Sequence, residues 1–327
     1  MNMEKPKINR TLIHIVSRFS NWQAADIETS FRENDIYANQ NDWSKFIKTF
    51  LMSLGIAFLV SGVIFFFAYN WASLHKFTKL GLVQVLLIAM VGVAVFSKLN
   101  KNVKGIILMG AGMLVGALFA VFGQIYQTGA NAYDFFFGWT AFIALWVFVS
   151  NFGPMWLLFL ALINISIWQY FEQVLGRVDE VKILDLLFII NLLYLILLKV
   201  LAHFGKITSV PRWLERVIVL ISISFLTFNL SFQVLDHETM SYLTVLLGVI
   251  ALTLGIYYGM RQKDTFFIAT IGLSIILIFL SLLIQTIFKA ADGLGGFFIT
   301  GIYVVGSISV LIFSIVNLNK QWHGDEE

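Results

Sequence analysis

Cysteine is absent from this sequence of 327 residues, and charge is scarce. Without cysteine, the chain cannot form disulfide bonds, use a thiolate nucleophile or hold a Cys-ligated metal. Asp, Glu, Lys and Arg make up only 13% of the residues, which is too little polar surface for a soluble globular protein of this length. The formal net charge of +3 is too small to indicate nucleic-acid binding. These absences point to a membrane protein.

Recognised catalytic motifs are also missing. The sequence contains no Walker loop, no dinucleotide-binding fingerprint and no nucleophile elbow. None of the five histidines has a metal-binding spacing. The cluster Asp236, His237 and Glu238 resembles an acid–base or metal group, but adjacent residues in a short loop usually point apart. We therefore expect no enzymatic activity, no cofactor and no metal site.

Long apolar runs dominate what the sequence does contain. Hydrophobic residues make up 59% of the chain, and the mean hydropathy is +0.84. The 32 Phe suit a lipid-facing surface, and the 9 Trp and 10 Tyr suit the membrane interfaces. A helix needs about 20 apolar residues to cross the hydrocarbon core. We predict about ten spans on this basis, at 47–69, 80–97, 105–124, 135–150, 155–171, 183–201, 217–235, 241–260, 265–287 and 296–318.

The spans must be helices, because irregular backbone cannot face lipid and the alternating strands of a barrel are not seen. We therefore predict an all-α, polytopic transmembrane helix bundle over residues 46–318. Residues 1–45 read as a cytosolic amphipathic segment, and residues 319–327 as a cytosolic tail. No cleavable signal peptide is apparent, because the first long apolar run begins near Phe46 and is long enough to span.

The distribution of Lys and Arg predicts the orientation. With ten spans and a cytosolic N-terminus, 17 of the 22 basic residues lie on the cytosolic side and 5 on the other. This asymmetry follows the positive-inside rule and places both termini in the cytosol. Merging the runs 135–150 and 155–171 into one helix would change the split to 13 against 9. We therefore predict a tight hairpin there, with a half-span that dips into the membrane as the alternative.

Carboxamide side chains gather at the outer ends of the odd-numbered spans. They are Asn70, Gln124 with Gln127, Gln169, Gln233 and Gln285. In three spans a spacing of i, i+7 and i+11 places three small or polar residues in a narrow stripe along the helix. The stripes are Gly116, Gly123 and Gln127; Ser222, Asn229 and Gln233; and Ser274, Ser281 and Gln285. Such stripes indicate either close helix packing or the lining of a cavity that opens outward.

A charged residue inside the membrane would be the strongest indication of function, because burying a charge is expensive. Asp185 lies about one turn inside the sixth span, from which its side chain could reach the outer interface. No charged residue falls in the middle of any predicted span. The sequence therefore disfavours a proton- or sodium-coupled pump that relies on a buried carboxylate.

Two segments resemble a family of bacterial membrane proteins. The first is Phe65-Phe-Phe-Ala-Tyr-Asn-Trp-Ala-Ser-Leu-His75 followed by Phe77-Thr-Lys-Leu-Gly81. The second is Gly123-Gln-Ile-Tyr-Gln127 followed by Trp139. Their order and spacing are similar to the signatures of domain of unknown function 2157 (DUF2157), a set of predicted multi-pass membrane proteins. The resemblance covers residues 8–150 and implies a bacterial inner-membrane (plasma-membrane) protein, and the family brings no established activity.

The polar stretch 123–139 predicts an outward loop between the third and fourth spans. Amides near helix ends can pair with the free backbone groups there, so one interpretation is that they cap and clamp neighbouring helices. The other interpretation is an outward-facing polar pocket. Its candidate residues are Asn70, Trp71, Gln124, Tyr126, Gln127, Asp134, Asn229, Gln233 and Gln285.

Two functions are compatible with these observations. The first is transporter-like handling of a small neutral or zwitterionic solute, or of a lipid fragment, through the outward pocket. The second is a non-catalytic membrane sensor or scaffold, in which Trp22, Phe31 and Trp43 of the N-terminal segment dock a protein partner. The predicted partners are the lipid bilayer, a small-molecule ligand and that protein, with no nucleic acid.

Overall fold

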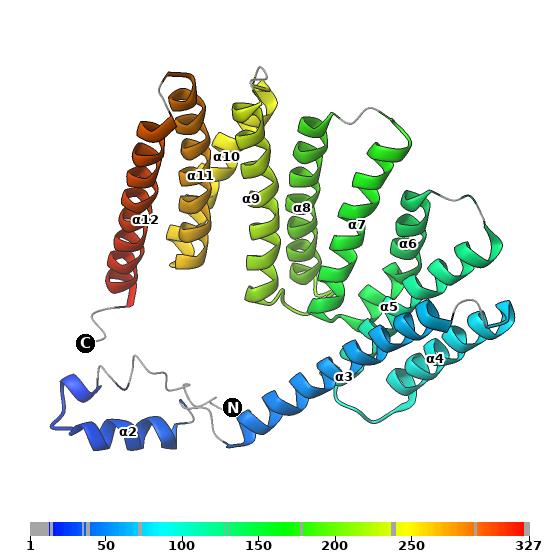
Figure 1. Ribbon diagram of the computed structural model, residues 1–327. Coiled ribbons are helices and arrows are strands. Elements are labelled where there is room, and N and C mark those ends of the chain that lie inside the picture. The colour runs from blue at the N-terminus through cyan, green and yellow to red at the C-terminus, as the bar shows by residue number, and fades with distance from the viewer. Residues whose placement is uncertain are drawn as a thin grey trace. The chain divides into compact units, whose positions relative to one another are not determined.

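The computed structural model describes residues 13, 16–34, 36, 40–70, 74–127, 129, 131–176, 179–236, 240–290 and 293–323. The chain divides into two compact units, Met1–Ser61 and Gly62–Glu327, and each is described by itself. The division falls within one long helix, α3 (Gln40–Asn70). Every regular element in the described residues is a helix, which confirms the all-helical prediction (Figure 1).

The first unit contains α2 (Ala24–Glu33) and the first part of α3. A reciprocal cap starts α2, because the backbone N–H of Gln23 donates to Asp26 Oδ2 at 2.8 Å. Phe31 on α2 is buried, whereas Trp22 and Trp43 are exposed. Of the three aromatic residues predicted to dock a partner, two are therefore accessible within this unit.

Ten helices in the described residues are long and apolar enough to cross a membrane. They are α3, α4 (Lys76–Phe96), α5 (Lys101–Tyr126), α6 (Ala132–Ser150), α7 (Gly153–Gln173), α8 (Glu180–His203), α9 (Arg212–Leu235), α10 (Tyr242–Gln262), α11 (Thr265–Ala290) and α12 (Gly293–His323). Each coincides with one predicted run, so the number and order of the spans are confirmed. The side of the membrane on which the termini lie stays a prediction.

The tight hairpin between α6 and α7 is present as two separate helices of 19 and 21 residues. Asn151 ends α6 in the left-handed conformation, with φ 45° and ψ 45°, and its N–H donates to Val147 O. Pro154 follows in the first turn of α7, where its missing N–H costs no hydrogen bond. The conformation of Asn151 and the position of Pro154 therefore support two separate helices joined by a tight turn, as the distribution of Lys and Arg predicts.

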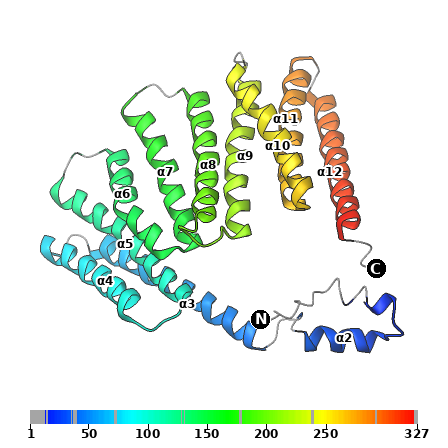
Figure 2. The same ribbon diagram turned by 180° about the vertical axis from the view of Figure 1, so that it is seen from behind.

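The helices of the second unit pack in chain order (Figures 1 and 2). From α4 to α9 each helix packs against the next, α10 and α11 both pack against α9, and α12 packs against α11. Buried residues of α5 to α9 form an extensive apolar core, which includes Met155, Leu160 and Ile218. A smaller core of Phe188, Leu226 and Leu230 lies between α8 and α9. This second core borders the polar groups described next.

Candidate functional site

A carboxylate is buried between α8, α9 and α10. Asp185, in the second turn of α8, is only 4% exposed. Asn229 Nδ2 on α9 donates to Asp185 Oδ1 at 2.8 Å, and Thr244 Oγ1 on α10 donates to Oδ2 at 2.7 Å. Among the residues that the structure describes, no Lys, Arg or His forms an ion pair with this carboxylate. Asp185 therefore relies on neutral donors and is buried between the helices; whether it lies near the outer interface stays a prediction.

A relay of hydrogen bonds fixes how these neutral donors point. The backbone N–H of Ser241 donates to Gln233 Oε1 at 2.6 Å, and Gln233 Nε2 donates to Asn229 Oδ1 at 3.1 Å. A backbone N–H can only donate, so it sets the orientation of both amides in turn. Asn229 must then turn its NH2 group towards Asp185, and this group also donates to Val181 O at 3.0 Å. We call Asp185, Asn229, Gln233, Ser241 and Thr244 the Asp185 cluster.

The same helices, with α11, line a partly open cavity of about 250 Å³, here called the α8–α11 cavity. Its lining is apolar over most of its length, with residues such as Leu195, Val219 and Leu254. One end is lined by Phe188, which follows Asp185 by one helical turn, and the other end by Lys199, Glu215 and Tyr258. The cavity therefore extends along α8 from near the Asp185 cluster to a group of charged and polar residues.

The polar end of the cavity is a bonded group of three side chains, here called the Lys199 cluster. Lys199 Nζ on α8 lies 2.5 Å from Glu215 Oε1 on α9 and donates to Tyr258 OH on α10 at 2.9 Å. The Tyr258 hydroxyl in turn donates to Glu215 Oε1 at 2.7 Å. Lys199 also lies over the Tyr258 ring, 4.7 Å from its centre. This cluster pairs its charges, unlike the Asp185 cluster.

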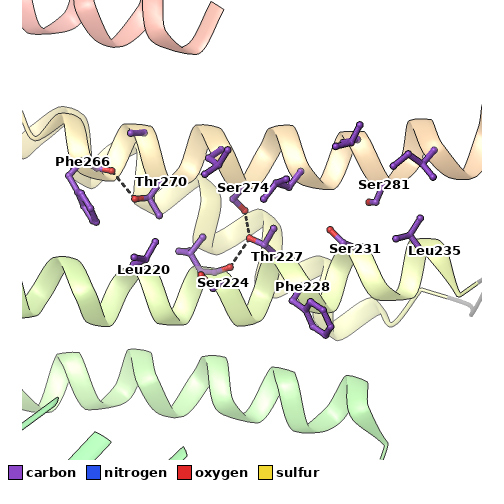
Figure 3. A pocket seen from close by; sticks show the side chains of 16 residues that line it. Leu220, Ser224, Thr227, Phe228, Ser231, Leu235, Phe266, Thr270, Ser274 and Ser281 are labelled. Atoms are coloured by element: carbon purple, nitrogen blue, oxygen red, sulfur yellow. Dashed lines mark hydrogen bonds between the residues drawn. The ribbon is translucent and has the colours of Figure 1, made fainter. Parts of the chain in front are cut away.

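A separate groove of about 610 Å³ runs between α9 and α11 (Figure 3). Thr227 Oγ1 donates to Ile223 O at 2.7 Å, so the 2.5 Å contact between Thr227 and Ser274 uses the Ser274 hydrogen. Ser281 also lines the groove, and it donates to Ile278 O of its own helix at 2.7 Å. The stripe on α11 therefore faces the hydroxyl side of α9 and not Asn229 or Gln233.

In the first stripe, on α5, Gly116 lies on a packing surface. A methyl group at Gly116 would lie 2.6 Å from the Trp139 ring, and Trp139 Nε1 donates to Gly112 O at 2.7 Å. Among the candidate pocket residues nearby, Gln124, Tyr126 and Gln127 are exposed. Asp134 is exposed as well, and it caps α6 by accepting from the Asn131 backbone N–H at 3.1 Å. The observed role of Asp134 is thus that of a helix cap.

The candidate pocket residues occupy different parts of the unit. Asn229 and Gln233 lie together in the Asp185 cluster. Asp134 belongs to α6, and α7 and α8 stand between α6 and α9 in both views (Figures 1 and 2). Gln285 is half-buried on α11. Trp71, the side chain of Asn70, and the loop residues His237 and Glu238 lie outside the described residues.

Sequence reasoning missed several residues of these clusters. Thr244 and Ser241 begin an apolar run and carry no pattern of their own. Lys199 lies near the end of the predicted span 183–201, and its pairing with Glu215 depends on the return of the chain from α8 to α9. In the sequence, the pairing is indicated only by the position of Lys199 and Glu215 on either side of the short polar connection 203–212.

Comparison with known proteins adds a family for the first part of the chain. Residues 19–156 match the family described as "Predicted membrane protein (DUF2157)". No curated protein and no solved structure matches the chain. The matched residues end in the first turn of α7, so the Asp185 cluster and the α8–α11 cavity lie beyond them. The resemblance seen in the sequence is thus confirmed: this chain is a multi-pass membrane protein, and its residues 19–156 match the DUF2157 family of predicted membrane proteins.

Proposed function

We propose that the protein is a non-catalytic, transporter-like carrier of a small zwitterionic or neutral amphipathic molecule, and that this molecule binds in the α8–α11 cavity. The single observation that supports the proposal is the composition of the cavity. An apolar chamber of about 250 Å³ ends in a few convergent polar groups, as small-molecule sites do. The volume suits a small solute or a fragment of a lipid.

The Lys199 cluster gives the head group of such a ligand its partners. Glu215 and Lys199 lie side by side and present one charge of each sign. A zwitterion would place its cationic group on Glu215 and its anionic group on Lys199, while Tyr258 offers a hydroxyl to either. The apolar part would then extend along the lining formed by Leu195 and Leu254. The outward polar pocket expected from the sequence is not needed for this mode of binding.

The proposed setting is the bacterial inner membrane, with both termini in the cytosol. The 17 basic residues on one side against 5 on the other support the orientation. In this orientation α8 runs inward, so the Lys199 cluster lies at the cytosolic end of the cavity and Asp185 towards the outside.

Ligand binding by the purified full-length protein tests the proposal with two named probes. Leucine represents a zwitterionic solute, and octylphosphocholine represents a lipid fragment. Either probe, at ten times its Kd, should stabilise the folded protein by about 1.4 kcal/mol, measured as a rise in Tm. A response to leucine together with uptake of radiolabelled leucine into proteoliposomes identifies a solute carrier. A response to octylphosphocholine alone identifies lipid handling.

A matched pair of variants locates the binding. Ala251→Leu fills the α8–α11 cavity, whereas Ala269→Leu adds the same atoms to the α9–α11 groove. We expect the probe to lose its effect on Tm in Ala251→Leu and to keep it in Ala269→Leu. The proposal fails if neither probe stabilises the wild-type protein, or if Ala251→Leu responds as the wild type does.

A further inference from the structure

The Asp185 cluster has a property that the binding cavity does not require. It holds a carboxylate that is 4% exposed and bonded to neutral donors only, among the residues that the structure describes. Taking an ionised carboxylate out of water costs several kcal/mol, even after the surroundings relax. A cation bound to the carboxylate would offset the cost of burying its charge. The geometry of the site then decides which cation can bind.

The helices packed around Asp185 supply no cation to it. On α8 itself, Lys182 is exposed and pairs with Asp179 at 2.6 Å. The stretches 153–171 of α7, 217–235 of α9 and 242–260 of α10 contain no Asp, Glu, Lys, Arg or His. The tyrosines in these stretches are Tyr170, Tyr242, Tyr257 and Tyr258, and Tyr242 is 94% exposed. Glu172 and Asp236 are exposed at the ends of α7 and α9, and His237 and Glu238 lie outside the described residues.

The orientation of Asn229 opposes a metal ion. Its NH2 group points at Asp185 Oδ1 and at Val181 O, so a metal ion at that position would face hydrogens instead of an oxygen. Turning the amide over would require Gln233 to turn as well, and its NH2 group would then face the Ser241 N–H. The relay therefore holds the Oδ1 side of Asp185 in a form that only accepts hydrogen bonds.

The Oδ2 side is different, because its partner is a hydroxyl. The Thr244 hydroxyl donates to Oδ2 at 2.7 Å, and a hydroxyl at this distance can equally accept a hydrogen bond. We propose that Asp185 Oδ2 is a proton-binding site. A proton passes from a hydronium ion to Oδ2 and leaves water behind; the new O–H donates to Thr244 Oγ1, whose own hydrogen rotates away. The hydrogen bond from Asn229 to Oδ1 is unchanged.

The site is arranged to link protonation to movement between helices. The donor to Oδ1 lies on α9 and the donor to Oδ2 on α10, while the carboxylate itself lies on α8. Separation of α9 from α8 would remove the Asn229 hydrogen bond that stabilises the charged form, and Asp185 would then take up a proton. A role for this proton as the coupling ion rests on the proposed transport function. The binding of the proton does not.

Infrared difference spectroscopy of the full-length protein in lipid, between high and low pH, tests the site directly. The other Asp and Glu residues also give carbonyl-stretch bands of protonated carboxylic acids at low pH, so we expect one component band of this region to be lost in Asp185→Asn. That variant can keep both hydrogen bonds, with its oxygen facing Asn229 and its NH2 facing Thr244, so it should remain folded. Asp134→Asn, which changes an exposed carboxylate, should keep the band.

Variants of Thr244 separate a proton partner from a packing role. Thr244→Ser keeps a hydroxyl and should leave the band in place, whereas Thr244→Val keeps the shape but should shift it, because the protonated acid loses its acceptor. An unshifted band in Thr244→Val would overturn the assignment to Oδ2. A band that persists in Asp185→Asn, or that never appears while the protein is folded, would overturn the proton site. Ala251→Leu, which fills the cavity but does not alter Asp185, should keep the band. Failure of the ligand-binding proposal can therefore be distinguished from failure of the proton site.

Discussion

Two sets of helix contacts, one in the family-matched region and one beyond it, are held together by different means. Between α5 and α6, a glycine at position 116 lies against the Trp139 ring, and the indole N–H bonds to a backbone carbonyl. Between α8, α9 and α10, the contacts are hydrogen bonds among buried side chains centred on Asp185. The first arrangement depends on shape and the second on the pairing of polar atoms.

The difference follows from the properties of lipid as a solvent. Lipid tails are as apolar as leucine, so helices in a bilayer associate through close packing and interhelical hydrogen bonds. At a closely packed surface, a substitution that keeps the size of the side chain but changes its polarity is tolerated, whereas a substitution that adds an atom is not. A hydrogen-bonded cluster tolerates an exchange that keeps every donor and acceptor, but not the loss of one. The predictions below test this distinction.

The largest effect is expected at Asp185. Asp185→Leu leaves one of the two buried N–H groups of the Asn229 amide without an acceptor and also deprives the Thr244 hydroxyl of its partner, which should lower the free energy of unfolding by about 3 kcal/mol or more. Asp185→Asn should cost about 1 kcal/mol or less, because both contacts can re-form. Reversible unfolding in mixed detergent micelles measures both. Equal losses in the two variants would show that charge, and not pairing, holds the cluster together.

The packing surface should respond to a single methyl group. Gly116→Ala places a carbon 2.6 Å from the Trp139 ring and should destabilise the protein by about 1–3 kcal/mol. Gly92→Ala on α4 is the matched control, because no neighbouring atom lies within 4 Å of the added carbon. The control should change stability by no more than about 1 kcal/mol, in the stabilising direction. Similar unfolding curves for the two variants would rule out close packing at Gly116.

Asn164 on α7 and Asn191 on α8 test hydrogen bonding between these two helices. Each NH2 group donates to the oxygen of the other amide, at 3.1 and 2.7 Å, and Asn191 is fully buried. Either single change to Leu should lower the free energy of unfolding by about 1–3 kcal/mol, because the remaining amide loses its hydrogen-bond partner. The double variant should cost less than the sum of the two. Additive losses in this double-mutant cycle would mean that the amides do not depend on one another.

The smallest effect is expected at the exposed start of α8. The hydrogen bond and charge of Lys182 hold the pKa of Asp179 below its ordinary value of 3.8. A lowered pKa means that Asp179 stabilises the folded state above the ordinary pKa and that this contribution disappears as the pH falls through the folded-state pKa. Asp179→Ala, which also removes a cap, should cost about 0.5–1 kcal/mol at neutral pH. Its unfolding curve should approach that of the wild type in acid, and a gap that is constant with pH would contradict this.

The spans could be predicted from the sequence because the bilayer fixes how many apolar residues a helix needs. The α6–α7 hairpin was also predictable, from the balance of Lys and Arg and from Pro154. The stripe containing Asn229 and Gln233 was found because residues four apart share a helix face. Helical periodicity identifies a face but not what lies opposite it. The partners Asp185, Thr244 and Ser241 therefore required the packing of three helices.

One backbone hydrogen, the N–H of Ser241, sets the orientation of the two amides in the Asp185 cluster. Ser241 has φ −66°, a value that proline adopts, and its side chain makes no capping hydrogen bond. Ser241→Pro would therefore remove the donor and little else, leaving Gln233 and Asn229 free to turn over. Asn229 could then turn its oxygen, instead of its NH2 group, towards Asp185 Oδ1 and Val181 O. The orientation of the amide that faces the carboxylate is thus set by a backbone group three hydrogen bonds away from that carboxylate.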